Sequence, residues 1–103
     1  MITEDYCSFE LSKLLEEKGF HAPDLHGLDS SQGHLWIKVT HQMAMKWLRE
    51  RHDLHIEVIY NPYYEEYKGC MYKTIGEYNY TEFYSTYEEA VEAAIKYSLE
   101  KLI

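Results

Sequence analysis

Alternating apolar side chains mark the stretch Leu54-His55-Ile56-Glu57-Val58-Ile59-Tyr60. Successive side chains of a β-strand point to opposite faces, so this alternation predicts a strand with one apolar face. Asn61 and Pro62 end the strand, because both residues favour turns and proline lacks a backbone donor. Residues 63–66 then fit a connecting loop. The fold is therefore expected to contain a sheet that begins at Leu54.

Two more strands are predicted beyond that loop, over residues 67–75 and 77–84, with Gly76 as the turn between them. Short links between three consecutive strands favour an antiparallel meander. On the last of these strands the period of two places a set of mostly aromatic side chains on one face: Tyr78, Tyr80, Glu82 and Tyr84. If helices cover the opposite face, these rings face solvent.

Helices are predicted on both sides of the strand region. An apolar stripe over residues 5–18 that includes Cys7 indicates the first, with Thr3 or Asp5 as its cap and Gly19 as its end. The same periodicity indicates a second helix over residues 41–52, which Thr40 caps, and a third that begins at Tyr87. Thr86 and Glu89 form a capping box for this third helix, and Glu92 and Lys96 have the spacing of an ion pair along its surface.

The segment between the first two helices is predicted to be mostly irregular. Turn-forming residues are dense in residues 21–33, so this part is expected to be a loop. Residues 35–39 are rich in β-forming side chains and predict a short strand. The whole sequence, residues 1–103, thus predicts a single α+β domain, with three helices packed on one face of an antiparallel sheet of three to four strands.

Composition excludes several classes of protein. The chain is 46% hydrophobic, which argues against disorder, and none of its apolar runs approaches the ~20 residues that a membrane helix needs. Its first five residues are acidic and do not resemble a secretory signal, so we expect a cytoplasmic protein without a membrane partner. The net charge is −8, and nucleic-acid binding is not expected because phosphate contacts need clustered Lys and Arg.

The sequence shows few of the patterns that carry catalysis. It has no HExxH or CxxC motif and no phosphate-binding glycine loop, so neither an enzyme, nor a cofactor, nor a metal is predicted. Cys7 and Cys70 are expected to be small buried side chains. The histidines are expected to be surface or capping residues, and His21, His26 and His34 of the predicted loop are the one set that could converge on a metal.

Tyrosine is the most unusual feature of the composition. Nine of the eleven tyrosines fall between Tyr60 and Tyr87, in a stretch that is also acidic. Tyrosine combines a large apolar ring with a polar tip and is common at protein interfaces, although aromatic pairs also stabilise sheets without any binding role. The predicted interaction surface comprises Tyr63, Tyr64, Glu65, Glu66, Tyr67, Tyr72, Tyr78, Tyr80, Glu82 and Tyr84.

Three stretches resemble a known group of sequences. They are Ile2-Thr3-Glu4-Asp5-Tyr6-Cys7-Ser8-Phe9-Glu10, Thr40-His41-Gln42-Met43-Ala44-Met45-Lys46-Trp47-Leu48-Arg49-Glu50, and the run of residues 86–100. In order and spacing they are similar to small uncharacterised proteins of phages and mobile elements of gut bacteria. The resemblance implies a small accessory protein that acts in the host cytoplasm, and it implies no catalytic residues.

These observations lead to two functional hypotheses. The first is a non-enzymatic protein-interaction module of a phage or mobile element, which binds a protein partner and inhibits a host or defence factor through its acidic, tyrosine-rich surface. The second is a module for a small planar ligand such as a nucleotide, which needs a concave pocket lined by the rings. A homodimer through an exposed tyrosine strand is compatible with both.

Overall fold

Three antiparallel strands form the sheet on which the fold is built. β3 (Leu54–Asn61), β4 (Glu66–Lys73) and β5 (Asn79–Tyr80) lie in the order β3-β4-β5. The computed structural model describes residues 6–20, 26–29, 34–37 and 39–103, with the backbone alone for 26–29 and 34–37. In the register of β3 and β4, Ile56 lies opposite Met71 and Val58 opposite Gly69. The predicted apolar face of the first strand is therefore also the face that packs on the core.

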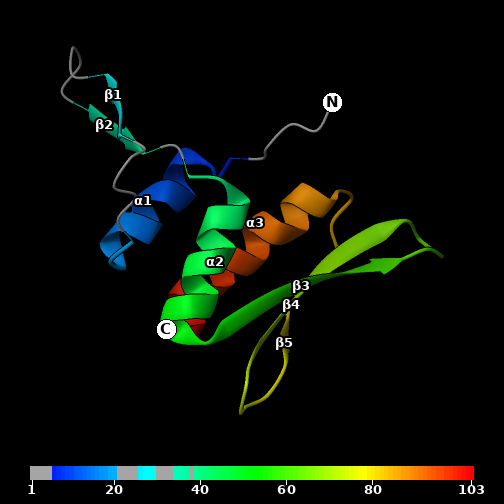
Figure 1. Cartoon of the computed structure of the whole chain (residues 1–103). Coiled ribbons are helices and arrows are strands. Elements are labelled where there is room, and N and C mark those ends of the chain that lie inside the picture. The colour runs from blue at the N-terminus through cyan, green and yellow to red at the C-terminus, as the bar shows by residue number, and fades with distance from the viewer. Residues whose placement is uncertain (1–5, 21–25, 30–33, 38) are drawn as a thin grey trace.

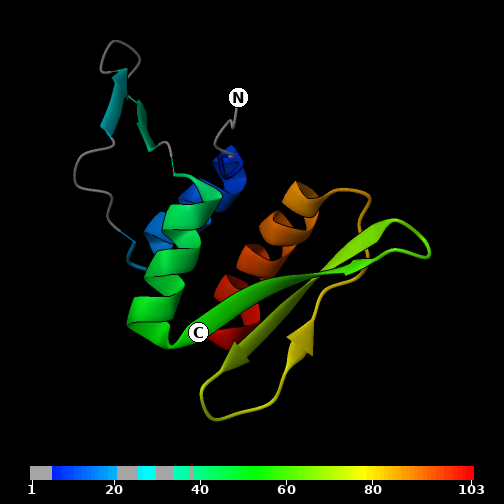
Figure 2. The same ribbon diagram turned by 45° about the vertical axis from the view of Figure 1, so that its right-hand side comes forward.

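The described residues include three α-helices: α1 (Phe9–Glu17), α2 (His41–His52) and α3 (Tyr87–Tyr97), which continues into a π-helical segment, η2 (Ser98–Leu102). α2 and α3 pack on this sheet, and α1 packs on α3. Figures 1 and 2 show all three helices on the same side of the sheet. α3 contacts β3, β4, α1 and α2, so it lies at the centre of the fold. The predicted α+β class is confirmed.

The starts of α2 and α3 are fixed by side-chain caps. The Thr40 hydroxyl accepts a hydrogen bond from the backbone N–H of Met43, and the Thr86 hydroxyl accepts one from Glu89. The Thr86 hydroxyl also donates a hydrogen bond to the Glu89 side chain at 3.0 Å, so the two residues of the predicted capping box contact each other through their side chains. Such caps satisfy backbone donors that the first turn of a helix leaves free, so both predicted start positions are confirmed.

The prediction for the first helix was wrong at its start. α1 begins at Phe9, and Ser8 caps it by accepting a hydrogen bond from the backbone N–H of Leu11 at 3.1 Å. Cys7 therefore precedes the helix, and its backbone N–H donates to the carbonyl of Val39 at 2.7 Å. Serine and aspartate cap helices about equally well, so the local sequence allowed this later start as well as the predicted one.

Part of the predicted loop at 21–33 is also a strand. β1 (His26–Asp29) pairs with β2 (His34–Ile37) in a separate two-stranded antiparallel sheet. β2 overlaps the predicted strand at 35–39, and β1 was missed because turn-forming residues surround its four positions. The proposed convergence of loop histidines lies outside the described side chains.

A β-bulge shortens the third strand of the sheet. β5 covers Asn79–Tyr80, although the backbone N–H of Thr81 still donates to the carbonyl of Gly69 at 2.9 Å. Tyr84 then pairs with Tyr67. Two residues, Glu82 and Phe83, therefore lie opposite the single residue Lys68. An extra residue shifts the alternation by one position. Tyr84 therefore lies on the opposite face from Tyr78 and Tyr80, which corrects the prediction that the three rings share a face.

Candidate functional site

The face of the sheet that points away from the helices, which we call the open face, carries a stack of three rings. The rings of His55 and Tyr72 stack with centroids 5.2 Å apart, and those of Tyr72 and Tyr78 with centroids 5.0 Å apart. The stack contains one ring from β3, one from β4 and one from the residue before β5. The Tyr72 hydroxyl donates to Glu57 at 3.1 Å, and this hydrogen bond raises its pKa. These contacts hold the open face in one arrangement.

A cation lies beside the second part of this face. The ammonium of Lys68 lies 4.5 Å from the ring centroid of Tyr80 and 5.1 Å from that of Phe83, within the range of cation–π contacts. Tyr78 and Tyr80 remain 60% and 49% exposed. Within the described residues, the open face is thus aromatic and of mixed charge, because both Lys68 and Glu57 lie on it.

The turn between β3 and β4 presents two more tyrosines. Tyr63 is 90% exposed and Tyr64 is 70% exposed, with ring centroids 5.8 Å apart. The backbone N–H of Tyr63 donates to the Asn61 side chain at 2.9 Å, and Glu65 takes the left-handed conformation with φ of 52°. We call residues 62–65 the hairpin tip. In both ribbon views it projects beyond the helices (Figures 1 and 2).

Rings at the base of the hairpin tip support it. Tyr60 and Tyr67, which pair across β3 and β4, have centroids 4.8 Å apart, and Tyr67 meets Tyr87 of α3 edge-on at 6.2 Å. Tyr87 is 43% exposed rather than part of the buried stripe of α3. These ring contacts connect the hairpin to α3, so they stabilise the strand ends from which the hairpin tip projects.

The predicted interaction surface therefore divides into three groups. Tyr63, Tyr64 and Glu65 lie at the hairpin tip, with Glu66 at the start of β4, and Tyr72, Tyr78 and Tyr80 lie together on the open face. Tyr67 and Tyr84 are half-buried on the side of the helices, and Glu82 is exposed in the bulge. The open face and the tip are the parts of the prediction that remain available for contact.

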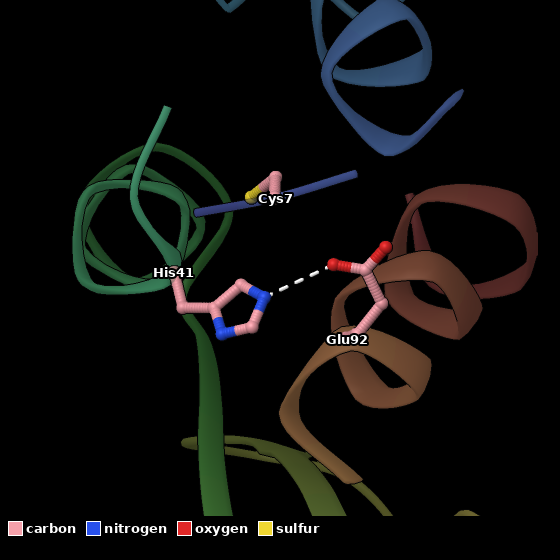
Figure 3. A group of neighbouring side chains, drawn as sticks. All are labelled: Cys7, His41 and Glu92. Atoms are coloured by element: carbon pink, nitrogen blue, oxygen red, sulfur yellow. Dashed lines mark hydrogen bonds and ion pairs between the residues drawn. The ribbon is translucent and has the colours of Figure 1, made fainter. Parts of the chain in front are cut away.

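A second cluster lies where the three helices meet, and the sequence predicted none of it. Cys7 precedes α1, His41 opens α2 and Glu92 lies on α3, and their side chains converge as Figure 3 shows. His41 Nε2 donates to Glu92 Oε1 at 3.0 Å, and the backbone N–H of Ser8 lies 3.3 Å from both carboxylate oxygens. Glu92 thus links the N-terminal ends of α1 and α2 to α3, where helix dipoles favour a negative charge.

Two pKa shifts describe the electrostatics of this cluster. Burial and the negative charge of Glu92 raise the pKa of the Cys7 thiol to about 12, so it is a neutral thiol and a poor nucleophile. Burial also acts to raise the pKa of Glu92, but the hydrogen bonds from His41 and Ser8 outweigh it, and the pKa lies below its ordinary value. Covalent thiol catalysis is therefore disfavoured at Cys7, while a soft sulfur, an imidazole and a carboxylate remain available as metal ligands.

An open pocket of about 540 Å³ adjoins the cluster. His41 and Glu92 line it, together with side chains before and within α1, one that follows the bulge and several from α3: Tyr6, Ser8, Glu10, Leu11, Leu14, Tyr84, Glu88, Glu89, Ala93 and Lys96. Small molecules and ions of the solvent can therefore reach the side of the cluster that faces this pocket.

Comparison of the chain with protein-family models, with curated proteins and with solved structures gave no match. Among the described residues, no helix has the length and apolar character needed to span a bilayer.

Acidification is expected to weaken the link that Glu92 makes between the helices. The Glu92 carboxylate has a lower pKa in the folded chain than the value of about 4.5 that an unperturbed glutamate has. It therefore stabilises the fold above that pH, and its contribution is lost as the pH falls through the folded pKa. Glu92→Gln should therefore cost about 1 kcal/mol at neutral pH, and this difference from the wild type should shrink below about pH 4. Thermal melts across this range, with a chelator present, measure it.

The matched control for this experiment is Glu88→Gln, which alters an exposed glutamate of the same helix. Its melting temperature should follow that of the wild type at every pH. If Glu92→Gln showed the same acid dependence as the wild type, the carboxylate would not be the group whose charge joins the three helices.

Proposed function

We propose that this chain is a non-enzymatic protein-interaction module that binds its partner through the hairpin tip and the open face of the sheet. The observation that carries the proposal is the exposure of Tyr63 and Tyr64 on a tip whose backbone is held by its own hydrogen bond. Rigid, exposed aromatic side chains make strong anchors, because they bury a large area and lose little conformational entropy.

The partner we propose is a host protein, as expected for an accessory protein of a phage or mobile element. The tip would inhibit a host or defence factor if it filled a pocket in which that factor binds its own substrate or partner. Glu65 and Glu66 directly follow the two tyrosines in the sequence, and Lys68 lies beside Tyr80 on the open face. A surface with this charge pattern fits an apolar pocket with a basic rim.

The planar-ligand hypothesis has weaker support. Tyr72 stacks on His55 through one face and on Tyr78 through the other, so neither of its faces is free for a nucleobase. A pocket of about 310 Å³ beside the stack is lined by Leu54, Tyr72, Lys73, Gly76, Glu77, Asn79, Lys101 and Leu102. Tyr72 is the one tyrosine of the predicted interaction surface that lines this pocket. A nucleotide site of the predicted kind needs several rings on which bases can stack.

Quantitative pull-down from host lysate tests the interaction proposal. Tyr63→Ala/Tyr64→Ala should reduce recovery of a specific partner by roughly 30-fold, the effect of losing an anchor worth 2 kcal/mol or more. Stability should change by less than about 0.5 kcal/mol, because both rings are exposed. The purified partner should then show the same ratio in a binding titration.

Two further variants separate the tip from other exposed side chains. Ile75→Ser removes an apolar side chain that is 91% exposed in the turn after β4, at the other end of the hairpin, and should leave partner recovery unchanged. Tyr78→Ala/Tyr80→Ala removes rings from the open face and should weaken binding as well. Equal recovery of every protein by the wild type and by both tyrosine variants would contradict the proposal.

A further inference from the structure

We infer that Cys7, His41 and Glu92 form a binding site for a divalent transition-metal ion, of which Zn²⁺ is the best fit. This site is separate from the hairpin tip and the open face, and its three residues belong to neither. The three side chains come from different elements, and Cys7 and His41 are only 6% and 7% exposed. Their convergence thus differs from a chance group of exposed acids on a surface.

The spacing of the donor atoms is close to that of a metal centre. One ligand atom from each residue lies within 4.8 Å of the other two, and the imidazole nitrogen lies 3.0 Å from the carboxylate oxygen. Metal–ligand bonds of 2.0–2.3 Å in tetrahedral geometry place such atoms about 3.4–3.6 Å apart. A shift of about 1 Å, which side-chain rotation supplies, would bring the three donors to these separations.

The donor set selects the kind of ion. A thiolate, an imidazole and a carboxylate are the ligands that Zn²⁺ uses in proteins, and thiolate excludes calcium and magnesium, which take oxygen ligands. Three protein ligands leave one tetrahedral position for a water molecule or another small ligand. His41 and Glu92 line the pocket and Cys7 does not, so this fourth position would face the pocket.

Backbone interactions already hold the three ligands in place. The N–H of Ser8 holds the Glu92 carboxylate, the N–H of Cys7 donates to Val39, and the Thr40 cap fixes the start of α2 beside His41. Hydrogen bonds of this kind orient ligands and raise metal affinity. On binding, the ion would take the place of the proton on His41 Nε2, the neutral imidazole would carry its proton on Nδ1, and the thiol proton of Cys7 would pass to solvent.

Cobalt titration of the chelator-stripped chain tests the site directly. Co²⁺ should give a thiolate-to-metal charge-transfer band in the near ultraviolet that saturates at one equivalent, and Zn²⁺ should then displace it. In the wild-type chain Zn²⁺ should also raise the melting temperature, because an ion that binds the folded state alone stabilises it. This second measurement needs no variant, so it holds even if a ligand substitution impairs folding.

The variants identify the ligands. Cys7→Ser should abolish the charge-transfer band, and His41→Gln should weaken binding by more than about 100-fold, beyond the loss typical of a residue that only orients a ligand. Cys70→Ser is the matched control and should leave the band unchanged, since Cys70 lies on β4 outside the cluster. A wild type without the band or without stabilisation by Zn²⁺, or a band that survives in Cys7→Ser, would overturn the inference.

Discussion

Gly69→Ala is expected to lower the free energy of unfolding by about 3 kcal/mol or more, as over-packing of a tight core does at its upper end. Gly69 lies on β4 directly beneath α3. A Cβ atom at this position would lie 2.6 Å from the Cβ of Ala94 and 3.2 Å from the carbonyl oxygen of Ala90. Carbon atoms pack at about 3.5–4.0 Å, and neither of these atoms can rotate away, so the whole helix must move. Urea denaturation of both proteins measures the loss.

The double variant Gly69→Ala/Ala94→Gly tests the cause of this effect. It removes the shortest contact while keeping the new methyl group on the strand, so it should recover part of the stability. Ala94→Gly alone should cost about 2 kcal/mol, from lower helix propensity and from the loss of a fully buried methyl group, and the two changes should therefore be strongly non-additive. If Gly69→Ala unfolded within about 0.5 kcal/mol of the wild type, α3 would not be seated on β4 as described.

Local signals were sufficient where a capping residue stands directly before a helical pattern. Thr40 and Thr86 are each the residue immediately before the first helical position, and both cap their helices as predicted. The alternation from Leu54 onwards likewise defined β3, because a register shift would have exposed every apolar side chain. In these elements local preference and tertiary packing favour the same structure.

Tertiary contacts decided the elements that the sequence did not predict. Thr3, Asp5 and Ser8 are all adequate caps, and Ser8 also donates its backbone N–H to Glu92, which lies 84 positions away. The bulge opposite Lys68 is equally invisible in a period-two pattern, since it arises from pairing with another strand. Neither feature has a local cause from which it could be predicted.

The Cys7, His41 and Glu92 cluster was missed for the same reason. Sequence spacing favoured Glu92 as the partner of Lys96 one turn along a solvent-facing helix surface, a pair worth a few tenths of a kcal/mol. In the fold, Glu92 binds His41 and Ser8 instead, where charge, helix ends and partial burial make the interaction stronger. The tyrosine face could be predicted in part because it follows from strand alternation alone.

Ile95→Ala is expected to lower the free energy of unfolding by about 2–5 kcal/mol, the range for loss of a fully buried aliphatic side chain. Ile95 has no exposed surface and lies on α3, the helix that contacts α1, α2, β3 and β4. Atoms from several elements surround the resulting cavity, and no one of them can fill it without losing its other contacts. The loss should therefore lie in the upper half of the range in chemical denaturation.

The matched control is Lys96→Ala, one position along the same helix and exposed, which should change stability by less than about 0.5 kcal/mol. Because the interaction surface lies on the other face of the sheet, Ile95→Ala should still recover the partner of the wild type at temperatures where it remains folded. A loss below about 1 kcal/mol would mean that the helices can close around the cavity independently. That result would contradict the central position of α3, on which both the tyrosine face and the Cys7, His41 and Glu92 cluster depend for their geometry.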